Sequence, residues 1–335
     1  MIQWKRVVMA FVIMAMVCTA CKSNSKTDSA QTDTAPKSTP IGNFDADSAY
    51  QYIADQVAFG PRIPGSDAHR NCRDWLVQSL KHHGADSVIV QEATVKAYNG
   101  DVLPISNIIA CFNIRQSRRV LLVAHWDTRP WADHDNTIEK RHSTFDGAND
   151  GGSGVGVLLE IARNLGQKTP SVGVDIMFTD AEDYGNSDGF DSNSDTWCLG
   201  SKYWSENIVP YRIDNLPVYG ILLDMVGGRN AVFHYEAFST QNAATPTIKV
   251  WSEAEALGYG DRFPRRLGGA VTDDHINITN AGIPTTDIIE LNNIETQSFP
   301  PTWHTLDDNM SNIDKSTLKA VGQTVLNVVY KEKPF

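Results

Sequence analysis

The sequence predicts an α/β fold, in which a mostly parallel central sheet is flanked by helices. The segments 120–124 and 218–223 are largely apolar, as is typical of strands that are covered on both faces. Segments with apolar residues every three to four positions, such as 155–165, alternate with these strands along the chain. Because strands that alternate with helices form βαβ units, their strands run parallel.

Each element has its own signal. The second helix, for example, can be capped by Ser66 or Asp67 and ends at Gly84. The expected helices cover residues 44–60, 66–84, 153–166, 247–257 and 316–329. The expected strands cover residues 88–95, 105–112, 120–124, 174–180, 218–223, 231–235 and 285–289. Neither an internal repeat nor a second linker interrupts this series, so we predict one catalytic domain over residues 44–335.

The composition is that of an ordinary globular protein. Of the 335 residues, 41% are hydrophobic and 21% are charged, and the formal net charge is −11. The chain has no basic patch, so we do not expect it to bind nucleic acid. The cysteines beyond residue 21 are odd in number and match no zinc-finger spacing, and we expect them to be small core residues: Cys72, Cys111 and Cys198.

The N-terminal residues predict export. Lys5 and Arg6 precede the apolar run 7–17, which is too short to cross a membrane and has the length of a signal-peptide core. Thr19 and Ala20 directly before Cys21 resemble a bacterial lipoprotein cleavage site. We therefore predict a signal peptide over residues 1–21 and lipid on Cys21. A polar, flexible tether would follow over residues 22–43, leaving the domain on the periplasmic side and attached to the membrane only through lipid. Simple cleavage and release is the alternative.

The stretch 174–185 carries the strongest chemical signal. An apolar strand here ends in the carboxylates of Asp180, Glu182 and Asp183. Carboxylates this close repel each other and prefer water, so they are costly at the end of a buried strand. The conflict is removed if Asp183 binds a metal cation while Glu182 stays free as a proton carrier. A solvated acidic turn is the alternative.

Other polar residues follow predicted strands in the same way. His125 and Asp127 come at the end of one strand, and Asp224 ends another. In open α/β sheets, ligands bind at this edge. The glycine-rich run 147–154 lacks the Gly-Lys-Ser/Thr of a phosphate loop, so we expect its glycines to let the backbone pass close beside Asp150.

Five separated motifs resemble one known family. In chain order they are His125-Trp126-Asp127, Gly147-Ala148-Asn149-Asp150, Asp180-Ala181-Glu182-Asp183, Leu223-Asp224-Met225 and Trp303-His304-Thr305. Their order is similar to that of the zinc aminopeptidase and glutaminyl cyclase superfamily. Within it, the chain looks most like the glutaminyl-peptide cyclotransferases.

The resemblance implies a role for each matching residue. It implies one zinc ion per chain, with the ligands Asp150, Asp183 and His304. The family often has Glu at the position of Asp183, so the shorter side chain is a departure. It also implies that Glu182 carries protons with Asp224 and Asp273 as acidic partners. The aromatic residues that it assigns to the substrate pocket are Trp303, Phe299 and Trp197; core packing is the alternative for all three.

The implied reaction converts N-terminal glutaminyl residues of peptides or proteins to pyroglutamate and releases ammonia. Two alternatives stay open at this point. One is an aminopeptidase with two zinc ions, in which His125, Asp150 and Asp224 would hold the second ion. The other is a surface-tethered binding lipoprotein without activity.

Overall fold

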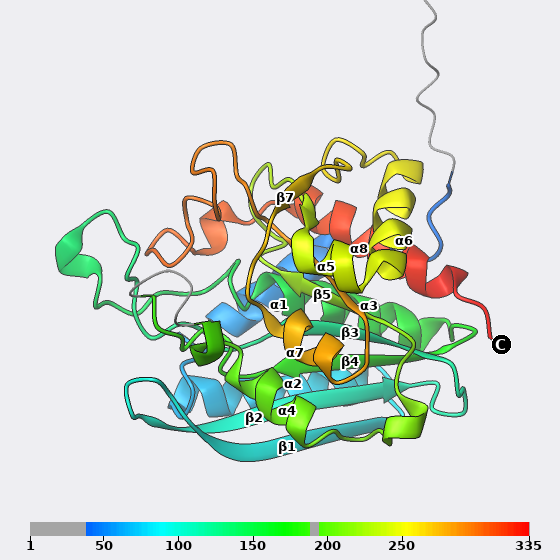
Figure 1. Ribbon diagram of the computed structural model, residues 1–335, viewed down its shortest axis with the longest axis horizontal. Helices are drawn as coiled ribbons and strands as arrows, with labels where there is room; N and C mark the ends of the chain where they lie inside the picture. Colours follow the sequence, from blue (N-terminus) through cyan, green and yellow to red (C-terminus); the bar gives the residue numbers. More distant parts are fainter. Residues whose placement is uncertain (1–37, 188–193, 335) are drawn as a thin grey trace, which may run out of the picture. The chain divides into compact units, whose positions relative to one another are not determined.

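A six-stranded sheet lies at the centre of the computed structural model, which describes residues 38–187 and 194–334 (Figure 1). Its strand order is β1-β2-β4-β3-β5-β8. The bounds of these strands are Ser87–Lys96 (β1), Val102–Phe112 (β2), Arg119–His125 (β3), Gly173–Thr179 (β4), Gly220–Asp224 (β5) and Thr285–Ile289 (β8). A separate pair is formed by Tyr235–Glu236 (β6) and Leu267–Gly269 (β7).

The prediction of a mostly parallel sheet is confirmed for four of its six strands. β4, β3, β5 and β8 pair in parallel, and all their residues are buried. β1 and β2 add an antiparallel edge, because a short turn joins them as a hairpin. The exposed, alternating pattern at the end of β1 is typical of an edge strand with one solvated face.

All five predicted helices are present, and helices cover both faces of the sheet. They are α1 (Ala46–Val57), α2 (Asp67–His82), α3 (Ser153–Gln167), α6 (Ala244–Ala256) and α8 (Lys315–Lys331). These five pack on one face, around the larger hydrophobic core. The second face is covered by two short helices that the sequence pattern did not predict, α4 (Leu199–Glu206) and α7 (Asp274–Asn280). The other short elements are α5 (Ala237–Asn242) and the 3-10 turns Ile138–Lys140, Ser194–Thr196, Ile213–Asn215 and Met310–Asn312.

The strand expected over residues 231–235 is wrong except at its end. Only Tyr235 belongs to a strand, β6. Ala231 and Phe233 are buried because they pack into the larger core, and the backbone N–H of Phe233 donates to the carbonyl of Arg262 at 2.7 Å. These two apolar residues therefore belong to an irregular segment that packs into the core, and not to a strand.

The last residues of the predicted tether are attached to the domain. The N–H of Ser38 donates to the carbonyl of Ala256 at 2.8 Å, and the N–H of Ile41 donates to Asn327 Oδ1 at 2.7 Å. Residues 38–43, which have the composition of a flexible tether, are thus held by hydrogen bonds to α6 and α8. The predicted signal peptide, Cys21 and the rest of the tether lie outside the described residues.

Two further sequence expectations concern the described part of the chain. Cys72, Cys111 and Cys198 are buried and free, as expected of small core residues. Within residues 38–187 and 194–334, none of the helices has both the length and the apolar character needed to span a bilayer.

Candidate active site

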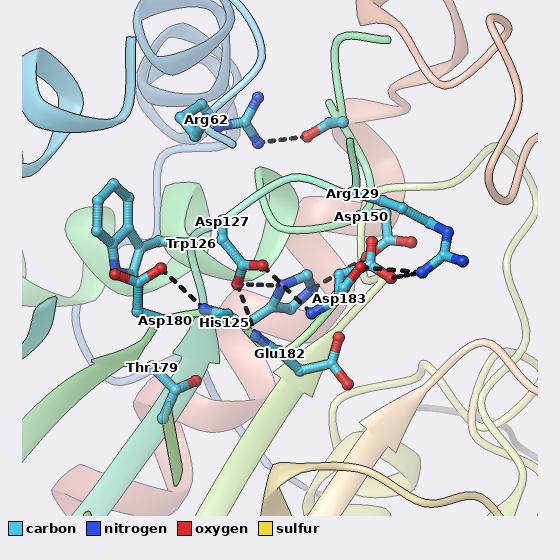
Figure 2. A network of polar contacts seen from close by, with 12 residues as sticks. Arg62, His125, Trp126, Asp127, Arg129, Asp150, Thr179, Asp180, Glu182 and Asp183 are labelled. Carbon is cyan, nitrogen blue, oxygen red and sulfur yellow. Dashed lines mark hydrogen bonds and ion pairs between the residues drawn. The ribbon is translucent and has the colours of Figure 1, made fainter. Parts of the chain in front are cut away.

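Polar side chains meet where the parallel strands end (Figure 2). β3 ends at His125, β4 ends just before Asp180, and β5 ends at Asp224. The chain turns sharply after two of these strands, since Ala181 and Met225 both have a φ of 48°. The turns bring the residues that follow each strand to one edge of the sheet, as the sequence predicts.

Three polar residues at this edge of the sheet form a group that can hold a metal ion. Asp150, Asp183 and His304 are buried, and each offers a ligand atom within 4.8 Å of the others. His304 Nε2 lies 2.9 Å from Asp183 Oδ1 and 3.5 Å from Asp150 Oδ2. These are the three residues that the sequence resemblance assigns to zinc, and they come from separate loops.

The donor set fits a divalent cation. Asp183 Oδ2 is buried and has no hydrogen-bond partner among the described residues. Burial raises the pKa of the Asp183 carboxyl to about 6, which reflects the cost of a negative charge at this place. Two carboxylates and one imidazole are a common zinc donor set, and a bound cation would offset the cost of burying them.

Buried carboxylates hold the backbone around two of these ligands. Asp127 Oδ1 accepts the N–H of Glu182 at 3.0 Å, and its Oδ2 accepts the N–H of Asp183 at 3.2 Å. Asp308 does the same for the other segment, since it accepts the N–H groups of Asn149 and Asp150 at 2.7 and 3.0 Å. The loops that carry Asp150 and Asp183 are therefore fixed by hydrogen bonds.

The glycine-rich run, which was expected to allow a close backbone path beside Asp150, brings the backbone next to the residues at the strand ends. A Cβ on Gly151 would lie 2.1 Å from the carbonyl oxygen of Asp127, and the φ of Gly151 is +84°. A Cβ on Gly154 would lie 2.2 Å from the carbonyl oxygen of Leu223. Larger residues would push Asp150 and the start of α3 away from the strand ends.

Glu182 belongs to a different group from its neighbour Asp183. Its Oε1 accepts a hydrogen bond from Cys198 Sγ at 3.2 Å, and it clusters with Cys198 and Asp273. Figure 2 shows the carboxylates of Glu182 and Asp183 lying apart. Burial, with the charge of Asp273 adding to it, raises the pKa of Glu182 well above its usual range. This geometry separates a proton-carrying carboxyl from the ligand group.

Asp273 lies in one cluster with Glu182, and Asp224 is close enough to Asp273 for their charges to interact. Burial raises the pKa of both carboxyls, and the charge of Asp224 adds to the shift of Asp273. His125 Nε2 lies 3.1 Å from Asp224 Oδ1 and 3.0 Å from Asp150 Oδ1. His125, Asp150 and Asp224 therefore form a second group that could hold a metal, and it shares Asp150 with the first.

Half-buried aromatic rings surround His304. The ring of Trp303 stacks on His304 with 3.8 Å between centroids, and the ring of Trp197 lies parallel to it at 6.1 Å. Phe299 packs against Trp303 at 4.6 Å. The three aromatic residues that the sequence resemblance assigns to a substrate pocket thus lie together beside the metal group.

The sequence patterns do not indicate several residues that support the site. The missed residues are Asp308, Cys198, Arg129 and Asp133, which support the loops and the ligands. Asp308 follows His304 by four residues in an acidic pair, and this was the one available signal. Asp180, in contrast, binds His69 at 2.9 Å and the N–H of Ser106 at 2.6 Å, away from the metal group.

Comparisons with known proteins agree with this geometry. Peptidase family M28 matches residues 107–329. The structure of a glutaminyl cyclase from Bacteroides thetaiotaomicron is 49% identical, with a TM-score of 0.83, and the match covers 88% of this chain and 100% of that one. A structure described as a Zn-dependent exopeptidase from Parabacteroides distasonis is 51% identical, with a TM-score of 0.83 and coverages of 87% and 100%.

A curated relative extends the similarity to animals. The glutaminyl-peptide cyclotransferase of Bos taurus is 25% identical over 287 residues, which are 77% of this chain and 74% of that protein. The residues that match the family, 107–329, include the parallel strands β3, β4, β5 and β8 and the ligand group Asp150, Asp183 and His304. The chain therefore belongs to peptidase family M28, and it is similar to glutaminyl cyclases of bacteria and animals.

Proposed function

We propose that the protein is a zinc-dependent glutaminyl-peptide cyclotransferase, which closes N-terminal glutaminyl residues to pyroglutamate and releases ammonia. One observation carries the proposal. The carboxylate of Glu182 is not part of the group formed by Asp150, Asp183 and His304. It lies instead beside another carboxyl group, that of Asp273. The site thus has a metal group and a separate proton-carrying group, and similarity to glutaminyl cyclases supports the choice of reaction.

The aromatic residues provide the binding surface. Trp197, Phe299 and Trp303 are half-buried and lie beside His304, so they can contact the glutaminyl side chain while the rest of a peptide stays in solvent. The substrate carries both reacting groups, an α-amine and a γ-amide, within one residue. Holding them in one conformation supplies much of the rate, because the reaction is intramolecular.

Glu182 performs the proton transfers in this proposal. The α-amine has a pKa of about 8, so much of it is protonated at neutral pH and cannot attack. Glu182 accepts a proton from the amine and later gives one to the leaving ammonia. Asp273 and Asp224 influence the protonation of this buried carboxyl, because carboxyl groups that lie close together share protons.

Zinc would be held by Asp150, Asp183 and His304, with one ion per chain. When bound, it supplies Lewis-acid polarisation of the γ-carbonyl oxygen. The second group has to share Asp150 and depends on Asp224, whose carboxyl has the buried Asp273 as a neighbour. A carboxyl that shares a proton is a poor metal ligand, and this favours a single ion.

A product assay tests the function against its alternatives. A glutaminyl peptide and an aminoacyl amide are each incubated with the zinc-loaded protein, and product mass and ammonia are recorded. We expect a peptide lighter by one ammonia, with equal ammonia in solution and no free amino acid. Free amino acid from either substrate would instead identify an aminopeptidase, as the similarity to a Zn-dependent exopeptidase would allow. If neither substrate gives a product, the remaining alternative is a binding lipoprotein without enzymatic activity.

We also propose, from the sequence alone, that the mature protein begins at Cys21 and is held to the membrane by lipid on the periplasmic side. Cys21→Ala removes the modified thiol, so it should block processing or release the protein from the membrane fraction. Fractionation and mass spectrometry of the N-terminal peptide measure both outcomes. A wild-type protein that is wholly soluble and has an unmodified N-terminus would contradict the proposal.

A further inference from the structure

The side chain of Arg129 is fully buried next to the metal group (Figure 2). A buried guanidinium is costly unless its donors are paired. Its Nε donates to Asp133 Oδ1 at 2.9 Å, and its Nη2 donates to Asp133 Oδ2 at 2.6 Å. This two-point contact fixes the orientation of both side chains, as a single contact would not.

The same guanidinium holds the loop that carries Asp183. Its Nη1 donates to the carbonyl oxygens of Asp183 at 3.0 Å and Gly185 at 3.1 Å, and its Nη2 donates to Ser187 Oγ at 3.3 Å. Nη1 also lies 3.8 Å from Asp183 Oδ1. Arg129 therefore sets both the backbone position and the electrostatic environment of this ligand.

Through Asp133, Arg129 also reaches His304. Asp133 Oδ1 lies 3.3 Å from His304 Nδ1, while His304 Nε2 faces Asp183 and Asp150. A carboxylate beside the distal nitrogen of a metal-binding imidazole orients the ring and increases its basicity. Arg129 in turn holds Asp133 in this position, because its guanidinium binds both carboxylate oxygens of Asp133.

Two indole rings complete the surroundings. The Arg129 Cζ lies 5.2 Å from the ring centre of Trp131 and 4.9 Å from that of Trp197. Cation–π contact holds Trp197 in place, and Trp197 lies beside His304. One guanidinium thus touches the Asp183 loop, the partner of His304 and an aromatic wall of the proposed pocket.

We propose that Arg129 is a positioning residue that fixes two zinc ligands, Asp183 and His304, which come from loops far apart in the sequence. The inference rests on the proposed function for the identity of the cation and deepens it. A lysine could not replace Arg129, because an ammonium group is a point charge and cannot bind both oxygens of Asp133 together with the carbonyls of Asp183 and Gly185.

The test measures zinc affinity and thermal stability in two arginine variants. Arg129→Met removes the clamp, and Arg119→Met is the matched control. The side chain of Arg119 is 8% exposed and makes an equivalent two-point contact with Asp175, at 2.5 and 2.7 Å. It lies at the start of β3, whereas the site follows the end of that strand. Zinc affinity is obtained by competition with a coloured chelator on the full-length protein.

We expect Arg129→Met to lower zinc affinity by about 10- to 100-fold, with Arg129→Lys close to it. Arg119→Met should lower the thermal midpoint, yet leave zinc affinity within about twofold of wild type, since distant sites act independently. A folded Arg129→Met protein with wild-type zinc affinity would overturn the proposal.

If Arg129→Met does not fold, Asp133→Asn decides the question. This variant keeps the shape of the side chain and removes the charge shared between Arg129 and His304. Its zinc affinity should fall by about tenfold or more, and an unchanged affinity would overturn the proposal. The readout requires no turnover, so a wild type that binds zinc but forms no pyroglutamate contradicts only the proposed function.

Discussion

Glu182→Gln should lower turnover by a factor on the order of 10² or more while zinc stays bound. The substitution keeps the size of the side chain and removes the group that exchanges protons with the amine and the leaving ammonia. Zinc should remain, because Asp183, and not Glu182, lies with Asp150 and His304. Turnover is measured by ammonia release with saturating glutaminyl peptide, and metal content by elemental analysis of the same samples.

Glu160→Gln serves as the control for this change. Glu160 is also a buried glutamate, but it lies on α3 and pairs with Arg163 at 2.6 Å, away from the strand ends. It should keep wild-type turnover even if the thermal midpoint falls. If Glu182→Gln loses its zinc, then the roles of Glu182 and Asp183 are exchanged. If it keeps both zinc and full turnover, then another group carries the proton.

Removal of zinc should abolish turnover, and one equivalent of zinc per chain should restore it. Without the ion, the carbonyl loses its Lewis acid, which is worth several kcal/mol, or about two to four orders of magnitude in rate. The protein is prepared without chelator for elemental analysis. It is then stripped with a chelator, and cyclase activity is titrated against added zinc.

His125→Asn tests the number of ions directly. It removes one donor of the second group but leaves Asp150, Asp183 and His304 in place. With a single ion, this variant should still bind one zinc per chain, as wild type does. Two tightly bound ions in active wild type, one of which is lost in His125→Asn, would contradict the one-zinc proposal and favour an aminopeptidase-like centre.

The sequence determined the class of the fold and the place of the site for one physical reason. A strand that is covered on both faces is mostly apolar, so the sequence of 120–124 and, apart from Asp175, that of 174–179 indicates core strands. Polar residues directly after such strands must then lie at one edge of the sheet. Short elements escaped this reasoning: α7 has seven residues, too few for a clear periodic pattern.

The sequence suggests different roles for Glu182, as a proton carrier, and Asp183, as a metal ligand. Only the tertiary structure shows how the two side chains are separated. The left-handed residue Ala181, with a φ of 48°, shapes the turn that places them in different groups. The hydrogen bonds that Asp127 accepts from the N–H groups of Glu182 and Asp183 hold this turn. The clamp made by Arg129 and Asp133 has no sequence signature at all. Its contacts join the segment of Arg129 and Asp133 to the loops of Asp183 and His304, which are far away along the chain. Such contacts form only when the loops have packed together.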